Sequence, residues 1–130
     1  MSLNSTLCDM IARIQNGQQS RKLEVFIIKT KLCLKILGIL KNEGYIRDYC
    51  ENGKFIKVLL KYSKDKPVIT KINAVLPNSK NTYLSVKLLR ELRSRNNDLS
   101  SLILSTPKGI LTDYNCILNN TGGRLLIEVF

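Results

Sequence analysis

The sequence contains no histidine and no tryptophan, and only 10 of its 130 residues are acidic. Histidine is the commonest general base near neutral pH and a frequent zinc ligand, so its absence argues against acid–base catalysis and against a zinc site. The few carboxylates are scattered along the chain, which is typical of solvated or helix-capping side chains. No phosphate-binding loop or dinucleotide fingerprint is present, since Gly122-Gly123 alone is too short for either. These absences predict a protein that is not an enzyme and has no cofactor, metal or small-molecule substrate.

Long apolar runs and paired cysteines are also lacking. No stretch is long enough to cross a bilayer, and Asp9 and Arg13 interrupt the first apolar segment before a secretory signal can form. No Cys-x-x-Cys pair occurs, and each cysteine lies in or beside an apolar run, where a free thiol acts as a small hydrophobe: Cys8, Cys33, Cys50 and Cys116. The pattern predicts a soluble intracellular protein in a reducing compartment, with no membrane partner.

What is abundant is positive charge. Lys and Arg number 21, the formal net charge is +11 and the pI is about 9.7. The excess is evenly spread: the part up to Ser63 holds 11 basic and 5 acidic residues, and the remainder holds 10 and 5. An even spread argues against a neutral domain with one basic tail. The charge favours a polyanionic partner, either nucleic acid or an anionic membrane, although high charge can also serve solubility alone.

The hydrophobic pattern predicts an α+β fold of two small, closely packed lobes, with the division after Ser63. The N-terminal lobe, residues 1–63, has α-β-α-β-β order. Helical spacing of apolar residues predicts its helices, and Asn52-Gly53 between alternating runs predicts its hairpin. The expected elements are a helix over Leu7–Ile14 that stops at Asn16-Gly17, a strand over Val25–Ile28, a helix over Cys33–Leu40, and strands over Tyr45–Cys50 and Lys54–Tyr62.

The C-terminal lobe, residues 64–130, is predicted to be mainly antiparallel β with short helices. Ser105 to Gly109 consists of residue types that form turns, and Thr112-Asp113 can cap a short helix that runs through Leu118. The other expected elements are strands over Val68–Leu76, Tyr83–Val86, Leu102–Leu104 and Leu125–Phe130, a helical turn at Leu88–Leu92 and a loop over Arg93–Asp98.

The best candidate for binding is the segment from Ser105 to Gly109. The hydroxyls of Ser105 and Thr106 donate and accept hydrogen bonds, so they can reach base edges, ribose 2′-hydroxyls or phosphates. Lys108 can neutralise a phosphate, and Gly109 permits close approach of the backbone. Taken alone, an ordinary solvent-facing turn explains the same residues.

Weaker candidates lie outside this segment. Lys29 and Lys31 flank the start of the second predicted helix, where amides and ammonium groups favour a phosphate. Arg13 and Asn16 end the first predicted helix, and Tyr83 follows the Asn78–Thr82 turn. A solvated helix start, a snorkelling arginine and a half-buried tyrosine are the plainer interpretations of these residues.

Several segments together resemble a known family, the eighth small-subunit ribosomal protein in its bacterial and organellar form. Order, spacing and total length agree with that family from about Asp9 to the C-terminus. The resemblance rests on the segments Asp9–Gly17, Leu40–Ile46, Leu60–Tyr62, Ser105–Asp113 and Thr121–Gly123.

The resemblance implies a structural, two-lobed protein of the small ribosomal subunit that acts in translation. Such a protein binds ribosomal RNA at an irregular helix of the central domain, aids assembly of the subunit and contacts neighbouring small-subunit proteins. It implies RNA contacts for Ser105, Thr106, Lys108 and Gly109, with Gly122-Gly123 nearby, and for Arg13, Asn16, Lys29 and Lys31. The chain departs from the family pattern at Pro107, at Arg124 and over Leu76–Thr82.

Three questions stay open at this level. Enrichment in Ile, Leu, Asn and Lys indicates an AT-rich genome, which points to an organelle-encoded, mitochondrial copy, with a bacterial cytoplasm or a plastid as alternatives. A translational repressor that binds messenger RNA by mimicry of the ribosomal site would use the same surface. A small enzyme would need a deep pocket lined by Asp113 and Glu128.

Overall fold

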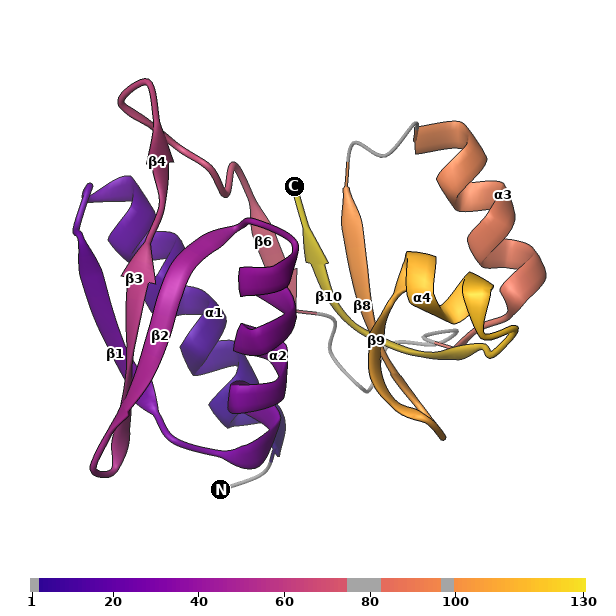
Figure 1. The fold of residues 1–130 in the computed structure, drawn as a ribbon, viewed down its shortest axis with the longest axis horizontal. Helices are drawn as coiled ribbons and strands as arrows, with labels where there is room; N and C mark the ends of the chain where they lie inside the picture. Colours follow the sequence, from indigo (N-terminus) through magenta and orange to yellow (C-terminus); the bar gives the residue numbers. More distant parts are fainter. Residues whose placement is uncertain (1–2, 75–82, 97–99) are drawn as a thin grey trace. The chain divides into compact units, whose positions relative to one another are not determined.

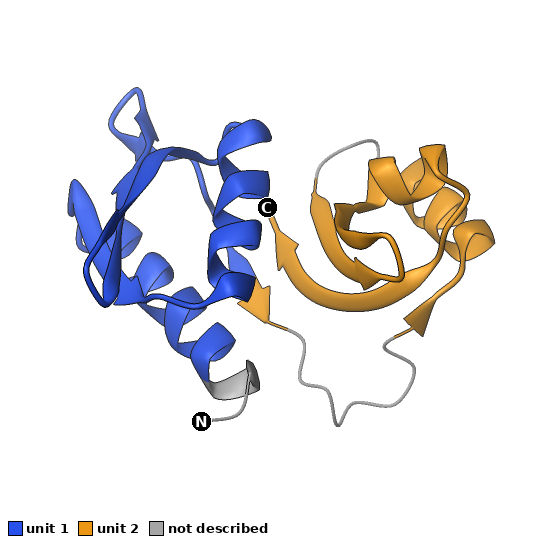
Figure 2. Ribbon diagram, turned by 60° about the horizontal axis from the view of Figure 1, so that its bottom comes forward, with its two compact units in different colours: residues 1–72 blue, residues 73–130 orange. Residues whose placement is uncertain are grey.

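The computed structural model describes residues 3–74, 83–96 and 100–130. The chain forms two compact units, residues 1–72 and residues 73–130 (Figure 2). The boundary therefore lies at residue 72 instead of residue 63. The reason is that the segment after Ser63 is attached to the first helix: the Ile69 amide donates to Gln18 Oε1 at 3.4 Å and the Ile72 amide donates to Gln15 Oε1 at 3.1 Å.

The N-terminal unit is a three-stranded antiparallel sheet with two helices against it (Figure 1). The strand order is β1-β3-β2, and Phe26 pairs with Lys57, which pairs in turn with Cys50. A two-stranded hairpin, β4 with β5, follows. The elements are α1 (Leu3–Gln19), β1 (Glu24–Ile28), α2 (Lys31–Asn42), β2 (Ile46–Asn52), β3 (Phe55–Leu60), β4 (Tyr62–Ser63) and β5 (Lys66–Pro67).

Alternation along β3 decides which face of this sheet is covered. Ile56, Val58 and Leu60 are buried, whereas Phe55 on the other face is 46% exposed. A strand whose alternate residues are apolar buries one face and leaves the other to solvent. The apolar stripes of α1 and α2 complete the core through Leu7, Met10, Ile11, Ile14, Cys33, Ile36, Leu37 and Leu40.

The C-terminal unit is built on an antiparallel sheet of order β6-β10-β8-β9, with β7 also paired to β10. Leu89 from α3, Leu104 from β8 and Cys116 from α4 are all fully buried in its hydrophobic core. The elements are β6 (Ile72–Ala74), β7 (Tyr83–Leu84), α3 (Val86–Asn96), β8 (Ser101–Thr106), β9 (Gly109–Thr112), α4 (Asp113–Leu118) and β10 (Gly123–Val129).

The predicted α+β class and the α-β-α-β-β order of the first unit are confirmed. The expected cap is confirmed as well, because Thr112 Oγ1 accepts from the Asn115 amide at 3.2 Å at the start of α4. The cysteines are free thiols. Burial raises the pKa of Cys33 and of Cys116 above the ordinary thiol value, as expected for cysteines that serve as small hydrophobes.

Three local predictions were wrong, and one strand was not predicted. The first helix passes through Gly17 to Gln19, because this glycine permits close packing: an added Cβ would lie 2.5 Å from Val25 Cγ1. Residues 93–96 extend α3 and are no loop, and 68–71 belong to no strand. A strand, β9, follows the Ser105–Gly109 turn. Residues 75–82 and 97–98 lie outside the described residues. They include the end of the predicted strand over Val68–Leu76, the predicted turn over Asn78–Thr82, the end of the predicted loop and the departure over Leu76–Thr82.

Within the part of the chain that the structure describes, no helix is long and apolar enough to span a membrane. The same residues contain no group of three or more potential metal ligands.

Candidate nucleic-acid interface

The turn between β8 and β9 is organised by the side chain of Thr106. Its hydroxyl donates to the Gly109 carbonyl at 2.8 Å and accepts from the Lys108 amide at 3.1 Å. Thr106 also pairs with Gly109 across the hairpin, and Gly109 has a φ of +115° that favours glycine. One lone pair of the hydroxyl is left for a ligand, because a hydroxyl has one proton and two acceptor positions.

Lys108 and Pro107 are exposed at the tip of this turn. The Lys108 ammonium donates to the Asn119 carbonyl at the end of α4, at 3.3 Å. This contact uses one of its three protons, so the ammonium is positioned while it still presents charge to solvent. Proline fixes its own φ and has no amide proton, which stiffens the turn but removes one donor that a ligand could use.

A row of side chains crosses four strands next to this turn. Arg124 of β10 pairs with Tyr83 of β7 on one side and with Ser105 of β8 on the other, and Ser105 pairs with Ile110 of β9. Residues directly opposite one another in antiparallel strands project from the same face. Leu104, next to Ser105, points into the core, so this row lies on the opposite face of the sheet. Tyr83 is 65% exposed there and Arg124 is exposed.

Gly122 and Gly123 allow β10 to approach its neighbours closely. A Cβ on Gly123 would lie 2.6 Å from the Ser105 carbonyl oxygen and 2.6 Å from Thr106 Cγ2. A Cβ on Gly122 would lie 2.6 Å from the Leu84 carbonyl oxygen. The two glycines therefore support the turn and the row through packing, and Gly123 itself is buried.

In the N-terminal unit, Arg13 and Asn16 line a groove of about 520 Å³ between α1 and β1. Arg13 Nε donates to Asp9 Oδ2 at 3.0 Å, and Arg13 Nη1 donates to the Phe26 carbonyl at 3.3 Å. The two contacts hold the arginine in place, and the Asp9 carboxylate offsets part of its positive charge. Lys22, which was not predicted as a site residue, lines the same groove beside the partly exposed ring of Phe26.

Lys29 and Lys31 lie on either side of Thr30, the N-cap of α2, whose hydroxyl accepts from the Cys33 amide at 3.1 Å. Lys29 is 3.4 Å from Glu51 in an exposed ion pair. Lys31 is exposed and has no ion pair with any residue that the structure describes. Of the two lysines, Lys31 is therefore the better placed to meet a phosphate.

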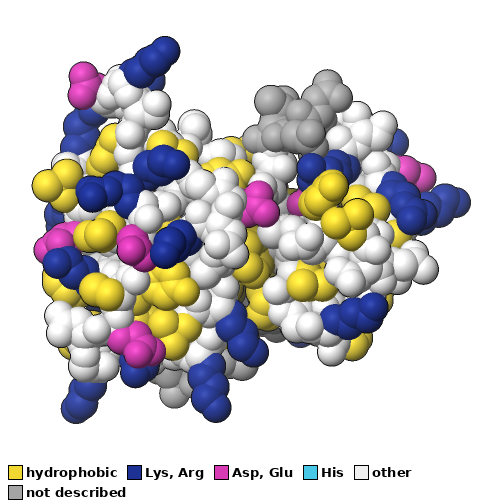
Figure 3. All heavy atoms as spheres, viewed as in Figure 1, with side chains coloured by type: hydrophobic (Ala, Val, Ile, Leu, Met, Phe, Trp, Pro, Cys, Tyr) yellow, Lys and Arg dark blue, Asp and Glu magenta, His cyan; other side chains and the backbone are white. Residues whose placement is uncertain are grey.

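The helix α3 adds basic residues that the sequence analysis missed. Lys87, Arg90 and Arg95 are exposed on it, and Lys and Arg side chains gather over this helix in Figure 3. Arg93 differs from them because it is 3.3 Å from the buried Asp113 carboxylate and 4.9 Å from the centre of the Tyr114 ring. The spacing of Leu88, Leu89 and Leu92 predicted only a helical turn here, followed by a loop. Without a complete helix, Lys87, Arg90 and Arg95 could not be placed together on one element.

The predicted residues thus form two sets, one in each unit. The C-terminal set comprises Ser105, Thr106, Lys108, Gly109, Gly122, Gly123 and Tyr83. Arg124, which was not predicted as a site residue, pairs with Tyr83 and Ser105 of this set. The N-terminal set comprises Arg13 and Asn16 at the groove and Lys29 and Lys31 at the start of α2. Neither set places acids and bases as a catalytic site requires, and Asp113 is engaged by Arg93 and by the Tyr114 amide.

Comparison with known proteins identifies the family of the chain. The family model described as ribosomal protein S8 matches residues 5–130. Among the curated relatives, the small ribosomal subunit protein uS8 of Brucella ovis is 39% identical and that of Chelativorans sp. is 38% identical, each over the full length of both chains. These relatives are bacterial and give no support to a mitochondrial origin. The chain belongs to the ribosomal protein S8 family of the small ribosomal subunit.

Proposed function

We propose that this protein is a primary RNA-binding protein of the small subunit, which recognises an irregular helix in the central domain of small-subunit ribosomal RNA and aids folding of that domain. The observation that carries the proposal is the turn at Thr106 beside the row of Tyr83, Arg124 and Ser105. A fixed hydroxyl, an arginine and an exposed aromatic ring on one small surface supply hydrogen bonding, charge and stacking together.

These groups suit RNA in which the regular duplex is interrupted. The major groove of A-form RNA is too deep and narrow for side chains, so proteins recognise shape, 2′-hydroxyls and unstacked bases. The Tyr83 ring, which is 65% exposed, offers a stacking surface, and the Thr106 hydroxyl keeps one acceptor position. Lys108, Lys31 and the basic residues of α3 would contribute affinity through phosphates without reading sequence.

The direct test is the binding of the purified protein to a fragment of central-domain small-subunit ribosomal RNA, with an unrelated duplex RNA of equal length as the competitor. The fragment should bind at least about tenfold more tightly, and the preference should increase with salt as the unspecific phosphate contacts weaken. Equal binding to both RNAs at every salt concentration would leave a generic basic protein and would refute the proposal.

A further inference from the structure

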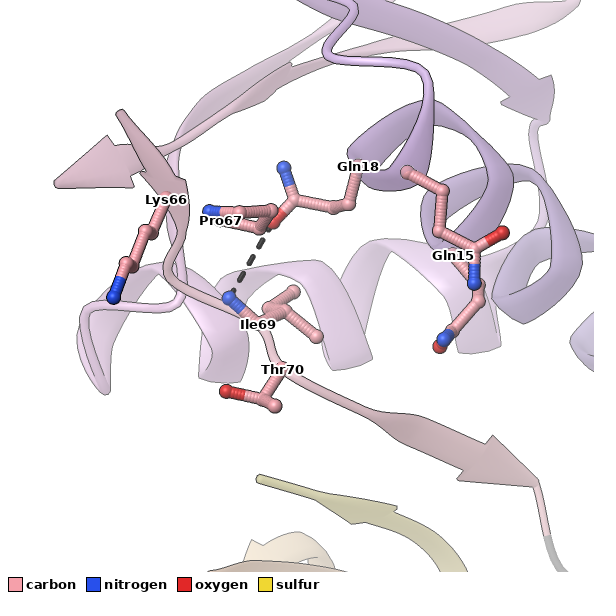
Figure 4. A pocket seen from close by; sticks show the side chains of 7 residues that line it. Gln15, Gln18, Lys66, Pro67, Ile69 and Thr70 are labelled. Atoms are coloured by element: carbon pink, nitrogen blue, oxygen red, sulfur yellow. Dashed lines mark hydrogen bonds between the residues drawn. The ribbon is translucent and has the colours of Figure 1, made fainter. Parts of the chain in front are cut away.

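The polar side chains of the hollow between the end of α1 and Lys66–Thr70 serve the fold. Gln18 is only 3% exposed, and its Oε1 accepts from the Ile69 amide at 3.4 Å (Figure 4). Gln15, which lines the same hollow, accepts from the Ile72 amide at 3.1 Å. Both glutamines attach the segment after β5 to α1, so contacts within the first unit explain their positions.

Tyr114 in α4, by contrast, presents an exposed aromatic ring that contacts within the C-terminal unit hold in place. The side chain is 51% exposed, and the guanidinium of Arg93 lies over the ring, 4.9 Å from its centre. Arg93 is itself fixed by an ion pair of 3.3 Å with the buried Asp113 carboxylate. A cation in this position is attracted by the face of the ring. Because the guanidinium covers one face, the exposed part of the side chain includes the other face.

The surface around this ring is apolar at its centre and positive at its edges. Leu118 lies one helical turn after Tyr114 on the same face of α4 and is 64% exposed. Arg90 is exposed and lies one turn before Arg93 on α3. The Lys108 ammonium donates to the carbonyl that follows α4, at 3.3 Å. Cations on two different elements thus border the apolar pair, and Figure 3 shows hydrophobic side chains beside Lys and Arg in this part of the molecule.

Carboxylates do little to offset these cations. Glu91 and Asp113 are the only acidic residues of α3 and α4. Asp113 is engaged by Arg93, and Glu91 lies two positions from Arg93, so the two side chains do not share a face of the helix. The exposed groups near Tyr114 are therefore apolar or cationic. A nucleotide satisfies both kinds of group, because it combines a planar base with a phosphate.

We propose that an unpaired nucleobase of the bound RNA stacks on the open face of Tyr114, with neighbouring phosphates at Arg90 and Lys108. The inference rests on the proposed RNA-binding function. It adds a contact on the side of the sheet that carries α3 and α4, opposite the row that contains Tyr83. Every base has a π-face, so an aromatic ring beside cations binds unpaired RNA without a requirement for sequence. Because Arg93 already holds the ring, little side-chain freedom is left to lose on binding.

The first test uses the absence of tryptophan from the chain. Tyr114→Trp places a single indole at the proposed site, and Phe55→Trp places one on the sheet of the other unit, where the native ring is 46% exposed. Each full-length variant is saturated with a transcript of the complete small-subunit ribosomal RNA, and filter binding confirms saturation. We expect the Tyr114→Trp protein to lose at least about half of its fluorescence through stacking, and the Phe55→Trp protein to lose little.

Unchanged fluorescence of the saturated Tyr114→Trp protein would overturn the inference. Quenching that requires added small-subunit proteins would also overturn it, because this surface would then dock a protein. Polyphosphate provides the control for charge, since it carries phosphates and no base. Equal quenching by polyphosphate and by RNA would show that the indole senses charge and not a stacked base, which would overturn the inference as well.

Affinity measurements on matched variants provide the second test. Tyr114→Leu removes the ring, Tyr114→Phe keeps it, and Phe55→Leu removes an exposed ring of the other unit as the control. We expect Tyr114→Leu to lower the affinity for the ribosomal RNA about tenfold, and the other two changes to alter it less than about twofold. Thermal unfolding shows that each variant is folded. Equal losses for Tyr114→Leu and Tyr114→Phe would overturn the stacking contact.

The same measurements separate this inference from the proposed function on which it rests. Selective RNA binding that is weakened by Thr106→Ala but not by Tyr114→Leu would leave the proposed function standing and the Tyr114 contact refuted. Equal binding of ribosomal and unrelated RNA by the unchanged protein would refute the proposed function itself.

Discussion

At the scale of single residues, Thr106 has the largest expected effect on RNA binding. Its hydroxyl joins the Lys108 amide to the Gly109 carbonyl, so Thr106→Ala loosens the turn and removes the proposed RNA contact. We expect a loss of roughly 1–3 kcal/mol of specific RNA affinity. Thr106→Ser keeps the hydroxyl and should lose less than half as much. Isothermal titration with the central-domain fragment checks both, and equal losses would show that the methyl group matters more than the hydroxyl.

Asp113 is the residue on which the stability of the second unit should depend strongly. It is 5% exposed, its Oδ1 accepts from the Tyr114 amide at 2.9 Å, and its Oδ2 accepts from Arg93 at 3.3 Å. Asp113→Ala removes the acceptor that these two donors share in a partly buried site and should lower the free energy of unfolding by roughly 1–3 kcal/mol.

The matched control is Asp9→Ala, which removes the exposed pair between Asp9 and Arg13. Exposed pairs contribute about 0–1 kcal/mol, so this change should be small. Urea denaturation of both variants gives the comparison. If Asp9→Ala proves as costly as Asp113→Ala, burial is not what makes the Asp113 contacts important.

At the scale of elements, the separation of β10 from β8 is set by Gly123. Gly123→Ala places a methyl 2.6 Å from the Ser105 carbonyl oxygen and from Thr106 Cγ2, and the backbone must shift to relieve the clash. We expect a loss of about 1–3 kcal/mol in unfolding free energy, as for an overpacked core, together with weaker RNA binding because the Thr106 turn moves.

Gly38→Ala in α2 is the control for that substitution. Its added methyl meets only the Tyr49 hydroxyl, at 3.2 Å, and alanine favours a helix over glycine by about 1 kcal/mol. Stability should therefore change by less than about 1 kcal/mol, and RNA binding should be unchanged. Thermal unfolding and an RNA titration of each variant test the two expectations. Normal RNA binding by Gly123→Ala would show that Gly123 is not needed to position the Thr106 turn.

The elements that the sequence predicted well are those whose signals are local. The spacing of apolar residues is sufficient to predict α2, and Asn52-Gly53 is sufficient to predict the β2–β3 hairpin. In both cases the residues that carry the signal lie within the element itself. Predictions failed where a distant contact decides the structure. The sequence around Gly17 is typical of a helix end, but in the structure Gly17 lies within the helix and packs against Val25. The polar residues 93–96 are typical of a loop, but Arg93 contacts Asp113 and Tyr114 and the segment is helical.

The candidate site shows the same division. The chemistry of Ser105 to Gly109 is visible in the sequence, because hydroxyl, lysine and glycine are adjacent. The row that joins Tyr83 to Arg124 and Ser105 depends on strand register, which sets residues 41 positions apart in sequence, Tyr83 and Arg124, opposite one another. Local residue patterns alone do not give that register, so the departure from the family pattern at Arg124 could be noted but its place in the sheet could not be predicted.

At the scale of the whole molecule, the positive charge is divided between the units, and this has a measurable consequence. Each phosphate that a lysine neutralises adds about 0.7–0.9 to the slope of log affinity against log salt concentration. If both units contact the RNA, Lys31→Ala in the first unit and Lys108→Ala in the second should each reduce that slope by about 0.7–0.9. Binding to the central-domain fragment between low and moderate salt gives the slopes.

Lys57→Ala is the control for this last prediction, because Lys57 is 3.0 Å from Glu24 in an ion pair on the sheet of the first unit. Its removal changes the net charge by the same amount without removing a proposed phosphate contact, so the salt slope should stay within error of the wild type. A uniform reduction by all three changes would mean that the slope reports overall charge alone. A reduction by Lys108→Ala only would restrict the RNA contact to the C-terminal unit, and the proposed phosphate contacts of Lys29 and Lys31 would then be refuted.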